Sequence, residues 1–184
     1  MIDLKNIKKT DKICLIVYGN IASGKSSFAK ELLKLLPGFV YACIDQVRID
    51  VYLENHLLRS IEREVKVEKI FKKMILDNNL IVYETVAVSP LFKNVILDLK
   101  RDHQLIYIHI DCPVAVCLRR FHQRNRDGYF SITPPFADKM SIEDFLYKVA
   151  KELRGMKEDI VLKSDKLNIE DMIKVFSTNL KFNI

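Results

Sequence analysis

The chain has 184 residues, 49% hydrophobic and 29% charged, an ordinary globular composition that excludes a disordered, collagen-like or coiled-coil protein. Its 30 lysines and arginines exceed its 24 acidic residues, which suits an anionic ligand but is not by itself a signature of nucleic-acid binding. The length predicts a single domain over residues 1–184. No apolar run nears the roughly 18 residues of a membrane span, so we expect no membrane partner. Four cysteines without C-x-x-C spacing predict reduced thiols and a cytoplasmic protein.

Strands and helices are predicted to alternate along the chain. Short apolar runs indicate five strands, at 13–18, 39–44, 80–83, 105–110 and 160–162. Helical spacing fills the intervals 25–36, 46–78, 90–101, 113–124, 142–155 and 169–179. In the second of these the expected apolar stripe is Ile61, Val65, Ile70, Met74 and Ile75. The alternation predicts a three-layer α/β fold with a parallel sheet, in which ligands bind beyond the carboxyl ends of the strands.

The most specific motif follows the first predicted strand. Residues 19–26 read Gly-Asn-Ile-Ala-Ser-Gly-Lys-Ser and match G-x-x-x-x-G-K-[ST] in full, between a strand and a helix. The backbone N–H groups of such a loop and the helix N-terminus bind phosphate oxygens. The motif predicts ATP as ligand, Lys25 as a catalytic cation at the β- and γ-phosphates, and Ser26 as a ligand of Mg²⁺. The predicted nucleotide-binding residues are Gly19, Asn20, Ala22, Ser23, Gly24, Lys25, Ser26 and Ser27.

Acidic residues follow two further strands. Glu84 closes the third predicted strand, where an acid holds magnesium in proteins with this loop, often through water; the alternative is a cap for the next helix. Asp45 and Arg48 form a D-x-x-R pair after the second strand and share one face of a helix. We expect Asp45 to be catalytic, accepting the proton of an attacking hydroxyl, and Asp45 and Arg48 to bind the acceptor. The alternative is a local ion pair that supports the helix.

A cluster of arginines precedes a polar loop. Arg120 and Arg124 are spaced i, i+4 on the predicted helix 113–124, before a loop that contains Pro134-Pro135. Arginines on a mobile lid, about 120–140, suit the charge of a transferring phosphoryl group, so both are predicted to be catalytic. The alternative is a solvated basic helix end. The aromatic residues of this loop leave nucleic-acid binding open.

Together these features resemble the small P-loop kinases, in particular the polynucleotide-kinase-like and zeta-toxin-like group, which is related to adenylate and shikimate kinases. The resemblance rests on the loop at 19–26, Asp45-x-x-Arg48, the strand ending in Glu84-Thr85, and 106–113 (Ile-Tyr-Ile-His-Ile-Asp-Cys-Pro), which leads to the lid arginines. It implies a P-loop NTPase fold with a five-stranded parallel sheet in the order 2-3-1-4-5 and a small lid. Adenylate kinases carry Thr-Gly where this chain has Cys43-Ile44, so a phosphate acceptor is not the first expectation.

The expected function is an ATP- and Mg²⁺-dependent phosphotransferase that moves the γ-phosphate of ATP to a hydroxyl of a small molecule or nucleotide. Two alternatives within the enzyme class are a nucleoside-monophosphate kinase and a 5′-hydroxyl polynucleotide kinase. A third alternative is a nucleotide-dependent switch ATPase, which needs no acceptor.

Overall fold

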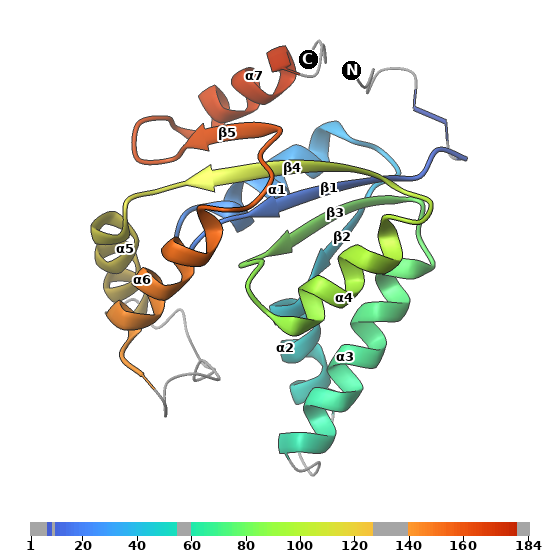
Figure 1. The fold of residues 1–184 in the computed structure, drawn as a ribbon, viewed down its shortest axis with the longest axis horizontal. Helices are drawn as coiled ribbons and strands as arrows, with labels where there is room; N and C mark the ends of the chain where they lie inside the picture. Colours follow the sequence, from blue (N-terminus) through green and yellow to red (C-terminus); the bar gives the residue numbers. More distant parts are fainter. Residues whose placement is uncertain (1–6, 9, 55–59, 127–139, 180–184) are drawn as a thin grey trace.

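The computed structural model describes residues 7–8, 10–54, 60–126 and 140–179, and its five strands form one parallel sheet (Figure 1). The strands are β1 (Ile13–Tyr18), β2 (Val40–Cys43), β3 (Leu80–Thr85), β4 (Gln104–Asp111) and β5 (Ile160–Lys163). Their order, β2-β3-β1-β4-β5, confirms the predicted order. Every residue of β1 is buried, because a central parallel strand is covered on both faces, and this explains its continuous apolar run.

Helices cover both faces of the sheet, which confirms the predicted three layers. The helices are α1 (Lys25–Leu35), α2 (Ile44–Glu54), α3 (Ser60–Leu76), α4 (Pro90–Leu99), α5 (Val114–Arg126), α6 (Ile142–Leu153) and α7 (Ile169–Asn179). On one face α1 and α7 pack against alternate strand residues such as Leu15, Val17 and Ile108. On the other face α2, α3, α4 and α6 pack against residues such as Ile16, Tyr18 and Tyr83. Alternate residues of a strand point to opposite faces, so β1 contributes to both cores.

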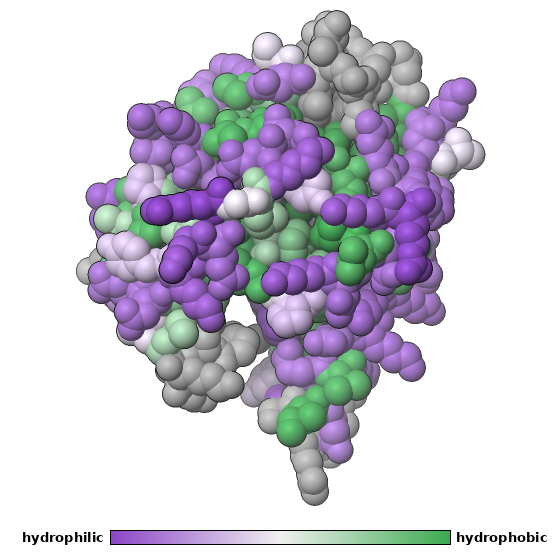
Figure 2. Space-filling view, viewed as in Figure 1, coloured by the Kyte–Doolittle hydropathy of each residue, from purple (hydrophilic) through white to green (hydrophobic). Residues whose placement is uncertain are grey.

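The prediction of helical structure over 46–78 needs two corrections. The described residues form two helices, α2 and α3, and the buried face of α3 carries Val67, Phe71 and Ile75. Three members of the predicted stripe, Ile61, Val65 and Ile70, are instead 78%, 64% and 38% exposed. Figure 1 shows α2 and the first turns of α3 extending past the sheet, and Figure 2 shows a hydrophobic patch there. The apolar spacing predicted the wrong buried residues at the start of α3, because no strand of the described sheet lies beneath that part of the helix.

Serine side chains cap two of the helices. Ser89 Oγ accepts a hydrogen bond from Phe92 N at 3.1 Å, and Ser141 Oγ accepts one from Asp144 N at 3.1 Å. The strand β2, however, ends at Cys43, so Asp45 lies in the first turn of α2 rather than at the end of a strand.

Residues 127–139, which carry most of the predicted lid, lie outside the described residues. The lid and the extent of the domain therefore stay predictions. All four cysteines are free, as the sequence indicated. None of the helices in the described ranges is long and apolar enough to cross a membrane.

Candidate active site

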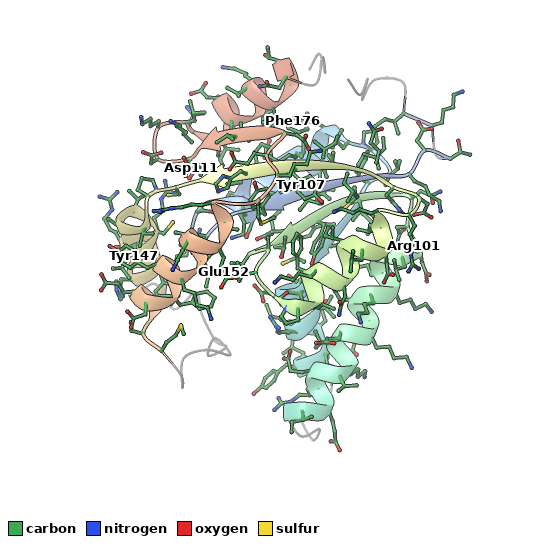
Figure 3. The ribbon with its side chains drawn as sticks, viewed as in Figure 1. Arg101, Tyr107, Asp111, Tyr147, Glu152 and Phe176 are labelled. Carbon is green, nitrogen blue, oxygen red and sulfur yellow. The ribbon has the colours of Figure 1, made fainter. Side chains whose placement is uncertain are left out.

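The candidate site lies at the carboxyl ends of the strands. Figure 3 shows Asp111 at this end of β4, beside α5, and Arg101 at the opposite end of the sheet. The predicted phosphate loop connects β1 to α1 here, and Lys25 is the first residue of α1. The loop backbone is left-handed at Ala22, with φ 57°, and at Gly24, with φ 101°. The predicted nucleotide-binding residues are therefore together in one turn between a central strand and a helix N-terminus, the arrangement that binds phosphate.

Gly19 permits a close approach that no other residue allows. A Cβ added there would lie 2.5 Å from the carbonyl oxygen of Ile110 on β4, and its φ of +152° disfavours a side chain. We expect Gly19→Ala to lower the free energy of unfolding by about 1–3 kcal/mol, measured by denaturant titration. Gly155→Ala is the matched control, because a Cβ added at Gly155 meets nothing within 4 Å. Equal stability of the two variants would contradict the argument.

Lys25 is folded back onto the loop. Its side chain is buried, and Nζ donates a hydrogen bond to the carbonyl oxygen of Asn20 at 2.7 Å. Burial lowers the pKa of Lys25, and the charges of Glu84 and Asp45 raise it by less. The ammonium group is therefore held inside the loop, close to two carboxylates of neighbouring elements.

Two other predicted loop residues use their side chains within the protein. Asn20 Nδ2 donates to the carbonyl oxygen of Leu146 on α6 at 2.9 Å, and Asn20 Oδ1 accepts from Ile21 N at 3.0 Å. Ser23 is completely buried, and its Oγ has no hydrogen-bond partner among the described residues. Asn20 thus attaches the loop to α6 and Ser23 is enclosed by protein, so contact with a phosphate would come from the loop backbone.

The predicted metal ligands are in contact with each other. The exposed Ser26 donates its hydroxyl to Glu84 Oε1 at 2.6 Å, although 58 residues separate them. The other carboxylate oxygen, Oε2, accepts a hydrogen bond from the Tyr41 hydroxyl on β2. Burial and the Glu84 charge raise the pKa of Tyr41, so the phenol stays a donor. Glu84 is thus held between α1 and β2, and the sequence analysis missed Tyr41.

The hydroxyl of Ser26 and the carboxylate of Glu84 fit a magnesium ion that is bound together with nucleotide. In the described ranges, no group of three or more His, Cys, Asp or Glu could hold a metal without other ligands. Mg²⁺ in phosphate-transfer sites typically takes one or two protein oxygens and completes its octahedron with phosphates and water. Two hard oxygen donors beside a phosphate loop match that requirement.

Asp45 and Arg48 are also paired, and α3 supplies a third member. Arg48 Nη1 donates to Asp45 Oδ1 at 2.8 Å, while Nε and Nη2 donate to Glu64 Oε2 at 3.2 Å. The Asp45 side chain is 76% exposed and that of Arg48 only 24%. Arg48 therefore ties α2 to α3, and Asp45 keeps a carboxylate open to solvent near the phosphate loop. Sequence spacing could not identify Glu64 as a partner of Arg48, because the two residues are 16 positions apart and lie on different helices.

Arg120 is built into the site rather than exposed on a helix end. Its Nη2 donates to the carbonyl oxygen of Ser164 at 2.8 Å, and its Nη1 lies 3.4 Å from the carbonyl oxygen of Ser23. Ser164 Oγ donates to the same Ser23 oxygen at 2.5 Å. Arg120 thus joins α5, the loop after β5 and the phosphate loop. Arg124, one turn further along α5, is partly buried.

Comparison with solved structures identifies the fold. Shikimate kinase from Acinetobacter baumannii, in complex with shikimate, matches with a TM-score of 0.62 at 14% identity, with 99% of each chain covered. A gluconokinase from Sinorhizobium meliloti 1021 matches with a TM-score of 0.57 at 11% identity, over 95% of this chain and 94% of the other. The chain has the fold of the small P-loop kinases. The resemblance drawn from the sequence motifs is confirmed at the level of the fold.

A third structural neighbour is longer than this chain. A chain of the Pnkp1/Rnl/Hen1 RNA repair complex matches with a TM-score of 0.62 at 17% identity. The match covers 83% of this chain but spans only about half of the neighbour, 49% of its length. The sequence matches no protein-family model and no curated protein. At these identities the structural neighbours establish the P-loop kinase fold alone.

Proposed function

We propose that this protein is an ATP- and Mg²⁺-dependent kinase that transfers the γ-phosphate of ATP to a hydroxyl of a small molecule or nucleotide. The observation that carries the proposal is the junction of β1, β3 and α1. There a complete phosphate-loop motif, the buried Lys25 and the hydrogen-bonded pair Ser26–Glu84 lie together. The P-loop kinase fold, which this chain shares with proteins named shikimate kinase and gluconokinase, supports the same conclusion.

Each residue of this junction has a role that follows from its charge. The loop N–H groups and the N-terminus of α1 attract the phosphates. Lys25 exchanges the Asn20 carbonyl for phosphate oxygens and offsets the charge that develops on them. Ser26 and Glu84 would hold Mg²⁺, which supplies further neutralisation of the phosphate charge. Asp45 accepts the proton of the attacking hydroxyl, and Arg48 binds an anionic group elsewhere on the acceptor.

The proposal is tested by ADP release from ATP with and without a panel of acceptors. The panel holds polyhydroxylated small molecules, including shikimate and gluconate, nucleoside monophosphates, and an oligonucleotide with a 5′-hydroxyl. ADP release that rises with a hydroxyl compound, together with a phosphorylated product by mass spectrometry, is the expected result. ADP release that no acceptor stimulates would favour a switch ATPase. Stimulation by AMP or CMP would favour a nucleoside-monophosphate kinase, and stimulation by the oligonucleotide alone a polynucleotide kinase.

Replacing either lid arginine should slow transfer more than it weakens ATP binding. If Arg120 and Arg124 stabilise transition-state charge, Arg120→Lys and Arg124→Lys should lower kcat by roughly 10²-fold or more, with a smaller rise in KM for ATP. Arg120→Lys should also lower the melting temperature, because Arg120 bridges Ser164 and Ser23. An unchanged kcat in both variants would assign these arginines a structural role only.

Removing the Tyr41 hydroxyl should weaken the dependence on magnesium. In Tyr41→Phe one oxygen of Glu84 loses its donor, and loss of a group that orients a metal ligand typically costs 10–100-fold in metal affinity. We therefore expect the Mg²⁺ concentration at half-maximal activity to rise by about 10-fold or more. Tyr147→Phe on α6 is the matched control, since Tyr147 is 58% exposed. A magnesium dependence equal to that of the control would contradict the orienting role of Tyr41.

A further inference from the structure

Two thiols meet beside the phosphate loop, in a cluster that the proposed transfer reaction does not use. Cys112 follows β4 and precedes α5, and Cys117 lies in the first turns of α5. Cys117 Sγ donates a hydrogen bond to the carbonyl oxygen of Cys112 at 3.8 Å, so the two residues are in direct contact. Both residues are buried, Cys112 with 9% of its surface exposed and Cys117 with none. Cys112 is thus the more exposed member of the pair.

The surroundings of Cys112 favour a thiolate. Arg120 Nη1 lies 3.5 Å from Cys112 Sγ and so places a permanent positive charge beside the sulfur. The backbone N–H groups at the start of α5 add the positive end of a helix dipole. The neighbouring Cys117 thiol and the charge of Arg120 lower the pKa of Cys112, and burial and the charge of Asp165 oppose them. The neighbouring Cys112 thiol and burial raise the pKa of Cys117.

The other two cysteines lack this environment. Cys14 lies in the centre of β1, completely buried, and burial raises its pKa. Cys43 lies at the end of β2 beside Glu84, and burial and that carboxylate raise its pKa to about 11. A nucleophilic thiolate and an adjacent protonated thiol are the two components of a redox-active pair.

We propose that Cys112 and Cys117 form a redox-active thiol pair, in which Cys112 is the site of attack on peroxides and other soft electrophiles and Cys117 is the resolving thiol. The Cys112 thiolate attacks one oxygen of hydrogen peroxide, the O–O bond breaks, and the leaving hydroxide takes up a proton to become water. The Cys117 sulfur then attacks the Cys112 sulfenic acid, an S–S bond forms, and a second water leaves. Two thiols are oxidised to one disulfide, and one peroxide is reduced to two waters.

This pair is distinct from the proposed nucleotide chemistry but adjacent to it. Arg120, which lies against Cys112 Sγ, also hydrogen-bonds the Ser23 carbonyl oxygen of the phosphate loop. The proposed redox chemistry of the two thiols does not require the proposed kinase activity, so an experiment can contradict either one without the other.

The first test compares the four cysteines of the reduced full-length protein. We expect iodoacetamide at pH 7 to alkylate Cys112 at least about 10-fold faster than Cys14 or Cys43, since a lowered pKa increases the thiolate fraction, as measured by peptide mass spectrometry over time. The rate at Cys112 should stay near its plateau down to a pH well below the usual thiol pKa of about 8.5. Faster labelling of Cys43 or Cys14 than of Cys112 would overturn the proposal.

The second test uses hydrogen peroxide on matched variants. The wild type and the control Cys43→Ser should form the Cys112–Cys117 disulfide, and dithiothreitol should reverse it. In Cys117→Ser, dimedone should trap a sulfenic acid at Cys112, and in Cys112→Ser neither product should form. Peroxide treatment of the wild type that yields no Cys112–Cys117 linkage would overturn the resolving role, whether or not the variants fold. Absence of any dimedone adduct in a folded Cys117→Ser would overturn the nucleophilic role of Cys112.

Discussion

Lys25→Ala is expected to lower ATP turnover by roughly 10²–10³-fold or more, because one preorganised cation facing the transferring phosphoryl group is lost. ATP binding should also weaken, since the same ammonium neutralises the β- and γ-phosphates. Steady-state kinetics and ATP titration measure both effects. A variant that binds and turns over ATP normally would contradict the assignment of the phosphate loop.

The Lys25→Ala variant should still fold. Lys25 is buried, and it donates to the Asn20 carbonyl oxygen at 2.7 Å. Its loss removes one hydrogen bond and one desolvated charge, so the free energy of unfolding should change by no more than about 1.5 kcal/mol. Lys30→Ala is the matched control, because Lys30 is exposed on the same helix and lies outside the loop. It should alter neither turnover nor ATP affinity.

Asp45→Asn should cut transfer to a hydroxyl acceptor by about 10²-fold or more while ATP binding stays intact, because the substitution keeps the shape and removes the basicity. A hydroxyl has a pKa far above neutral and gains from a carboxylate that takes its proton. A phosphate acceptor is already an anionic nucleophile and needs no base. Separate measurements of kcat and of the KM for the acceptor therefore test whether Asp45 acts as a base and whether the acceptor group is a hydroxyl.

The contacts of Arg48 with Glu64 allow the Asp45→Asn variant to test the loss of the base without a displacement of Arg48. Arg48 keeps its two contacts with Glu64 when Asp45 is replaced, so the guanidinium should stay in place. Glu64→Gln is the matched control, because it weakens the support of Arg48 without touching the proposed base. We expect it to raise the KM for the acceptor and largely keep kcat. A loss in Asp45→Asn that appears only as a higher KM would mean that Asp45 merely orients Arg48.

Local patterns in the sequence predicted most of the fold. The apolar run before Gly19 forms β1, and the helical spacing over 90–101 and 142–155 forms α4 and α6. These features depend on residues that are near one another in the chain. The predicted stripe of α3 was wrong at Ile61, Val65 and Ile70, because burial depends on what lies opposite each residue and the first turns of α3 extend past the sheet.

By itself the sequence determined the phosphate loop, since its glycines, its lysine and its flanking elements all lie within one short segment. Only the tertiary structure decided what surrounds that loop. The contacts of Glu84 with Ser26 and Tyr41, and of Arg120 with Ser23 and Ser164, join residues 43 to 97 positions apart. Such contacts depend on which strands are neighbours and in what register, as when β1 and β2 pair with β3 and bring Val17 and Cys43 beside Glu84. No local spacing encodes that register, because it is set by the packing of all five strands and their helices at once.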